Sequence, residues 1–218
     1  MSKTEVAENT AAFKKRATER GFDVGSGWLS WHDDTMFVYA TASFITRSKP
    51  ATGTSFIWYI WAKPLQADEQ LWRHLFPESD LGGERKKLTL RANGAFRTTG
   101  LPVSEGFFYS DPATIETQID GFLDEFTDAV TAWSAGSDRV EKYLAAIEAD
   151  LAVAPNQKLS RLGLMRTTAL LVLNRDREAL EAATSDLADG RDGSLYDGDK
   201  SVNQLIVEHL STHLEGRA

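Results

Sequence analysis

The most constraining feature of the chain is a strand-like segment with large apolar residues at both odd and even positions, FIWYIWAKP at residues 56–64. Side chains along a strand point alternately to the two faces of a sheet. Phe56, Trp58 and Ile60 would therefore lie on one face, and Ile57, Tyr59 and Trp61 on the other. A sheet with one solvated face shows polar residues at every second position. The pattern instead predicts a sheet whose two faces both need cover.

Other segments predict the rest of this sheet. Residues 27–34 and 35–46 alternate as strands around a turn at Asp33-Asp34, and Pro64 ends the third strand because it lacks a donor N–H. Residues 86–93 and 95–100 predict two strands around the turn Ala92-Asn93-Gly94, and 101–110 a final one. All of these can pair as hairpins, so the sheet should be mainly antiparallel.

Two helices are predicted to cover the sheet. Residues 4–20 carry Phe13 and Ala17 on one stripe, and Gly21 follows as a stop. A longer helix begins with Asp111 as cap and Pro112 in the first turn. Its apolar stripe comprises Ile115, Ile119, Phe122, Phe126, Val130 and Trp133. A short amphipathic helix is expected at 67–76, between two of the strands.

After Ala135-Gly136-Ser137 only helices are expected, at 138–152, at 157–173 and beyond. We therefore predict an α+β fold, with residues 1–135 as the sheet domain and 136–218 as an all-helical part docked on it. Residues 162–183 resemble one helical hairpin of a tetratricopeptide-type repeat. A solenoid needs about three copies, so a single copy favours a helical bundle or cap.

The order of these features resembles a family of uncharacterised bacterial α+β domains of unknown function. The likeness rests on Lys14-Lys15-Arg16 before Gly21-Phe22, on the aromatic strand that begins at Gly27-Trp28, and on the long helix that ends near Trp133. It covers residues 1–135. The resemblance implies a fold and a bacterial origin, and it assigns no activity or site.

Composition excludes several classes of function. The net charge is −8, and Lys and Arg cluster only at 14–16 and 85–87, so we expect no extended nucleic-acid surface. The chain has no cysteine, which excludes disulfides, Cys-ligated zinc and thiol catalysis. It has no apolar run long enough to span a bilayer, and its first residues are polar. These features predict a cytoplasmic protein without membrane contact, whose acidic surface suits a basic protein partner.

Few residues suggest chemistry. His209 and His213 are spaced by four on a predicted helix, so they share a face and are candidate metal ligands. The alternative is an ordinary helix edge. His32-Asp33-Asp34 fits either a base beside two carboxylates or a polar turn, and the Asp-rich residues 186–200 fit a solvated acidic loop. Nucleotide-binding and serine-hydrolase motifs do not occur in the sequence.

The tryptophans complete the candidate residues. Trp28, Trp31, Trp58 and Trp61 either belong to the core or line a pocket for an apolar ligand. Three hypotheses follow. The first is a non-catalytic protein-binding factor of accessory, inhibitor or immunity type, with no cofactor. The second is a small-molecule-binding domain with a Trp-lined pocket. The third is a metal-dependent hydrolase. The sequence favours the first.

Overall fold

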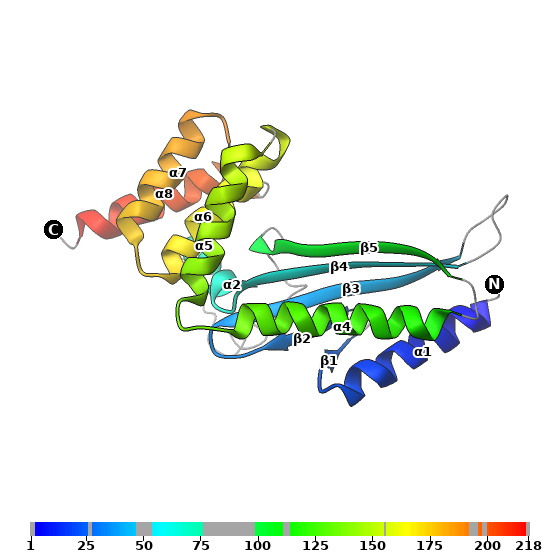
Figure 1. Ribbon diagram of the computed structural model, residues 1–218. Helices are drawn as coiled ribbons and strands as arrows, with labels where there is room; N and C mark the ends of the chain where they lie inside the picture. The colour runs from blue at the N-terminus through cyan, green and yellow to red at the C-terminus, as the bar shows by residue number, and fades with distance from the viewer. Residues whose placement is uncertain are drawn as a thin grey trace. The chain divides into compact units, whose positions relative to one another are not determined.

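The computed structural model describes residues 3–25, 28–46, 54–75, 99–110, 114–154, 156–191, 196–197 and 200–216 (Figure 1). The elements are α1 (Lys3–Glu19), β1 (Asp23–Val24), β2 (Trp28–His32), β3 (Met36–Thr46), β4 (Thr54–Pro64), α2 (Ala67–Leu75), β5 (Leu101–Ser110), α4 (Ile115–Ser134), α5 (Arg139–Val153), α6 (Asn156–Val172), α7 (Asp176–Ala188), β6 (Tyr196–Asp197), β7 (Lys200–Ser201) and α8 (Val202–Glu215). The predicted α+β class is confirmed.

The chain divides into two compact units. The sheet unit comprises residues 1–33, 37–62 and 102–135, and the helical unit comprises 34–36, 63–101 and 136–218. One boundary between the units falls at 135/136, and α2 groups with the later helices. The helical unit also contains the short antiparallel ribbon β6–β7, so the part after residue 136 is not all-helical as predicted. Docking of the two parts stays a prediction.

The sheet has the order β1-β2-β3-β4-β5, which follows the chain as hairpins predict. β2 and β3 are antiparallel, with Trp28 opposite Thr41 and His32 opposite Phe37, around the predicted turn at Asp33-Asp34. Among the described strands β1 and β5 lie at the edges. The two strands predicted within 86–100 lie outside the described residues, except for Thr99 and Gly100.

Helices α1 and α4 cover one face of the sheet, which we call the first face (Figure 1). The ring of Phe56 from β4 meets Phe13 of α1 at 6.5 Å and Phe122 of α4 at 5.6 Å between centroids. Trp58 also packs on Phe122, at 5.7 Å. The predicted stripe of α4 is buried here except for the partly exposed Val130. The two helices that the sequence assigned to the sheet therefore do cover it.

The ends of these two helices obey local rules. After α1, Gly21 has φ +83°, its N–H donates to Thr18 O, and the N–H of Phe22 donates to Ala17 O. This pair of bonds is the Schellman ending, which requires a left-handed residue that glycine adopts without strain. The start of α4 differs from the prediction. Asp111 and Pro112 lie outside the described residues, and Thr114 occupies the N-cap position.

The helical unit packs α6 between α5 and α7, and α7 against α8, while α2 contacts both α6 and α8. The α6–α7 hairpin turns at Asn174, whose φ of +57° is a left-handed value that Asn tolerates well. α8 begins with a capping box. Its N-cap Ser201 accepts from the N–H of Gln204, and the Gln204 side chain accepts from the N–H of Ser201. None of the described helices is long and apolar enough to cross a membrane.

Candidate functional site on the second face of the sheet

The face of the sheet opposite α1 and α4, which we call the second face, carries a row of aromatic rings. It runs from His32 on β2 through Phe37 and Tyr39 on β3 to Trp61 and Tyr59 on β4. Tyr39 and Trp61 stack with centroids 5.2 Å apart and planes 22° apart, and Trp61 and Tyr59 stack at 5.6 Å and 21°. Strand alternation places these rings together, because Phe37, Tyr39, Tyr59 and Trp61 are odd-numbered residues of β3 or β4. His32 of β2 lies opposite Phe37 in the sheet.

Burial is highest in the middle of this row, because His32 at one end and Tyr59 at the other are exposed. Phe37 and Tyr39 are buried, Trp61 is half-buried, and Tyr59 is 42% exposed. Ile45 of β3 is 45% exposed, and Phe107 of β5 is 42% exposed. Alternation puts both on the second face, since Phe44 on β3 stacks with first-face Phe56, and Phe108 on β5 contacts first-face Trp58. We call Ile45, Tyr59, Trp61 and Phe107 the aromatic patch. Exposed apolar side chains that gather on one face of a sheet are a candidate binding site.

The charge of the sheet unit is distributed unevenly. Its described Lys and Arg residues lie in α1 or directly after it, at positions 3, 14, 15, 16 and 20. No described strand residue of this unit is Lys or Arg, and neither is any residue of α4. On the second face, Glu105 of β5 is exposed and makes no ion pair with any residue in the described part of the chain. The aromatic patch is therefore bordered by an acid and by no described base of this unit.

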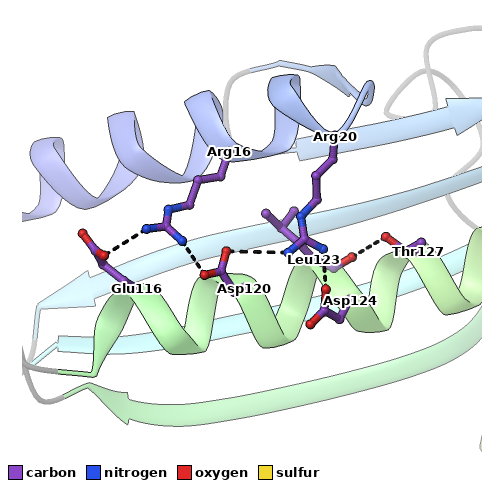
Figure 2. A network of polar contacts seen from close by, with 7 residues as sticks. All are labelled: Arg16, Arg20, Glu116, Asp120, Leu123, Asp124 and Thr127. Carbon is purple, nitrogen blue, oxygen red and sulfur yellow. Dashed lines mark hydrogen bonds and ion pairs between the residues drawn. The ribbon is translucent and has the colours of Figure 1, made fainter.

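Arg16 and Arg20 form ion pairs with acidic residues of α4 (Figure 2). Arg16 pairs with Asp120 and, at 2.9 Å, with Glu116, while Arg20 pairs with Asp124. The hydrogen bond with Asp120 is the main cause that raises the pKa of Arg16. These pairs border a hollow of about 400 Å³ lined by Ala12, Lys15, Arg16, Glu19, Arg20, Glu116 and Asp120. Its opposite charges compensate one another, so we assign it to holding α1 on α4.

The predicted tryptophan site divides between the two faces of the sheet. Trp31 pairs with Val38 and Trp58 packs on α4, so both lie on the first face. Trp28 pairs with Thr41 and lies with Trp61 on the second face. Trp58 is 4% exposed, and its Nε1 donates to Glu125 at 3.0 Å. Residues on opposite faces cannot line one pocket, so the four do not form a single site. Ligand binding by either pair stays a prediction.

The two predicted metal ligands, His209 and His213, lie in the helical unit, where a third histidine, His74, lies next to His209. Nδ1 of His209 on α8 lies 2.7 Å from Nδ1 of His74 on α2, a hydrogen-bond distance. The rings of His209 and His213 stack at 6.2 Å. Burial is the main cause that lowers the pKa of His74, to about 4, and it also lowers that of His209. Across the described ranges, no group of three or more His, Asp or Glu is arranged to hold a metal ion. Metal binding by His209 and His213 stays a prediction.

The other acidic candidates have structural partners. Asp34 is 90% exposed and lies 3.5 Å from Arg139, as a polar turn residue would. Asp186, which the sequence placed in a solvated loop, is instead buried at the end of α7. Its Oδ1 accepts from Arg166 at 3.2 Å and from Nε of Arg191 at 2.9 Å. The expectation of a solvated acidic loop is therefore wrong for Asp186, because two arginines compensate its charge inside the helical unit.

The side chain of Asp186 leaves no room for a Cβ at Gly163. We therefore expect two Gly→Ala substitutions to change the free energy of unfolding in opposite directions. A Cβ at Gly163 on α6 would collide with Oδ2 of Asp186 and lie 2.9 Å from its Cγ. We expect Gly163→Ala to lower the free energy of unfolding by about 2 kcal/mol. Gly121→Ala on α4 is the matched control, with nothing within 4 Å of its Cβ, and should stabilise by about 0.5–1 kcal/mol. Urea denaturation of both variants checks this, and a stabilising Gly163→Ala would contradict it.

Sequence reasoning missed one buried charged pair. Nζ of Lys63, at the end of β4, lies 2.7 and 2.8 Å from the two carboxylate oxygens of Asp68 on α2. Both side chains are buried within the helical unit, at 0% and 1% exposed. Thr99 also forms a side-chain hydrogen bond with Asp68. The backbone oxygen of Thr99 in turn accepts from the hydroxyl of the buried Tyr143. A lysine directly before Pro64 gave no signal of burial.

Comparison with known proteins gives no further constraint: no family model, curated protein or solved structure matches the chain. The resemblance of residues 1–135 to a bacterial domain family therefore stays a prediction, and the function is argued from the geometry above.

Proposed function

We propose that the protein is a non-catalytic protein-binding factor, of accessory, inhibitor or immunity type, that binds its partner with the second face of the sheet. The observation that supports this best is the aromatic patch, where Tyr59, Phe107 and Ile45 are each more than 40% exposed. Aromatic side chains are enriched at the centre of protein interfaces, because they bury large areas and lose little conformational entropy. A partner that covers this face would bury them.

The rival hypotheses draw less support from the described residues. The four candidate tryptophans divide between two faces, and His209 lies at hydrogen-bond distance from His74. The net charge of −8 suits a basic protein partner better than a nucleic acid. We keep the cytoplasmic location and the bacterial origin as parts of the proposal, to be tested with it.

The test compares capture by the immobilised full-length chain and by two variants. Tyr59→Ser combined with Ile45→Ser removes two of the three exposed apolar side chains of the patch. Val153→Ser is the control, because Val153 is 83% exposed but lies on α5 in the helical unit. We expect a protein that binds the wild type and the control equally, and whose Kd rises at least about tenfold for the double variant. The measurement is a titration with the purified protein.

A folding check accompanies this comparison, and the circular dichroism melting curves of the three proteins should agree within a few degrees. If no captured protein distinguishes the double variant from the control, the proposed surface is wrong.

A further inference from the structure

We propose that the second face recognises a Lys- or Arg-bearing segment of the partner, with the cation placed over the ring of Tyr59 and beside Glu105. This inference rests on the proposed function and names the chemistry of the partner. It is argued from the stacking of the rings, from the position of Glu105 and from the distribution of charge in the sheet unit.

Tyr59 is the last ring of a stack. Trp61 stacks with both Tyr39 and Tyr59, with interplanar angles of 22° and 21°. Tyr39 is 2% exposed, whereas Tyr59 is 42% exposed. The side of Tyr59 away from Trp61 is thus where a partner can approach this stack. The face of a tyrosine ring carries negative potential and attracts Lys and Arg side chains within about 6 Å.

Glu105 belongs to β5, the strand next to the one that carries this ring. On the first face, the indole of Trp58 covers Gly106 so closely that a Cβ there would collide with it. β4 and β5 are neighbouring strands, so the stretch around Gly106 runs beside Trp58. Alternation then puts Tyr59 on the second face next to Glu105 and Phe107. A carboxylate and an exposed aromatic ring together form a site that suits a cation.

The charges of the sheet unit support this choice of partner. Glu105 has no ion-pair partner among the described residues, and the described cations of this unit lie in α1, which covers the first face, or directly after it. A nucleic acid would be repelled by Glu105. A second copy of the chain packed symmetrically through this face would bring two Glu105 carboxylates into one interface, where like charges are unfavourable. A cationic segment compensates the carboxylate and covers the aromatic patch at once.

The experiment uses the full-length chain and three labelled decapeptides with one Val/Thr background. They carry four Arg, four citrulline or four Glu residues, and their binding is followed by fluorescence anisotropy. Citrulline keeps the shape of Arg without its charge. We expect the Arg peptide to bind at least tenfold more tightly than the citrulline peptide, and the Glu peptide to bind most weakly.

Variants locate the cation. Glu105→Gln and Tyr59→Leu should each weaken binding of the Arg peptide by about fivefold or more. Binding of the citrulline peptide should stay nearly unchanged. Tyr59→Phe keeps the ring and should bind as the wild type does. Glu181→Gln, at an exposed acid on α7 in the helical unit, is the matched charge control and should have no effect.

Each other outcome has a defined meaning. Equal binding of the Arg and citrulline peptides, still dependent on Tyr59, overturns the cation inference and leaves the proposed function intact. Equal effects of Glu105→Gln and Glu181→Gln overturn it as non-specific attraction. Self-association that Tyr59→Leu abolishes assigns the face to a second copy and overturns it too. If none of the three peptides binds, the inference is overturned. The proposed function is contradicted only if the captured protein binds the wild type and the double variant of the patch equally well.

Discussion

Lys63→Met is expected to lower the free energy of unfolding of the helical unit by about 3–5 kcal/mol. The ammonium of Lys63 contacts both carboxylate oxygens of Asp68, at 2.7 and 2.8 Å, and the two side chains are 0% and 1% exposed. Methionine fills a similar volume without charge. The variant therefore leaves the Asp68 carboxylate buried without its counter-ion, and a buried unpaired charge is costly. Urea denaturation followed by circular dichroism measures the loss.

The double variant Lys63→Met/Asp68→Leu separates charge from packing. It removes both buried charges together, so the desolvation cost disappears with the attraction, and apolar replacements of such pairs are often neutral or stabilising. We expect it to recover most of the stability that the single variant loses. The bond from Thr99 to Asp68 is lost as well, which limits the recovery. If single and double variants were equally unstable, the loss would come from packing and not from the unpaired charge.

The pH dependence of the single variant gives an independent check. Burial raises the pKa of Asp68 above 3.8, and the charge and hydrogen bond of Lys63 oppose this rise. Without Lys63 the folded-state pKa should rise further. A raised carboxyl pKa leaves stability intact below the unfolded value and costs stability as pH rises above it. The deficit of Lys63→Met relative to the wild type should thus shrink between pH 7 and pH 4.

Periodicity predicted most of the described elements. The strand patterns at 27–34, 35–46 and 56–64 predicted β2, β3 and β4, and the turn at Asp33-Asp34 predicted the pairing of β2 with β3. Spacings of three and four residues produced α1 and α4, including their cover of the first face. Gly21 ends α1 as predicted because its conformation is a local property.

Several of the missed contacts join residues that lie far apart in the sequence. His74 meets His209 across 135 residues, and Arg16 meets Asp120 across 104. Nothing local in the sequence distinguishes these side chains from solvated ones. Asp186 is buried because Arg166 and Arg191 reach it from α6 and from beyond α7. The exposure of Tyr59 beside the half-buried Trp61 could not be predicted from the sequence either. A strand pattern predicts which residues share a face but not what covers that face.

Acidification from pH 6.5 to about 4 is expected to destabilise the helical unit by about 3 kcal/mol through His74. Burial lowers the pKa of His74 from 6.5 to about 4, and the neighbouring charges of His209, His213 and Arg73 act in the same direction, while Asp176 opposes them. A histidine with a lowered pKa contributes no pH effect well above 6.5, where it is neutral in both states. As pH falls, the unfolded chain takes up the proton first, so stability is lost until the folded state titrates as well.

The variant His74→Gln tests this result. Glutamine cannot titrate, so the variant should lose about 3 kcal/mol less than the wild type between pH 7 and pH 4, measured as the change in urea-derived free energy of unfolding. His32→Gln is the matched control, because it removes an exposed histidine of the sheet unit and leaves His74 in place. The titration of the His74 C2–H by NMR reports its folded-state pKa directly. A value near 6.5 would contradict the burial of a neutral His74 against His209, and the two slopes would then coincide.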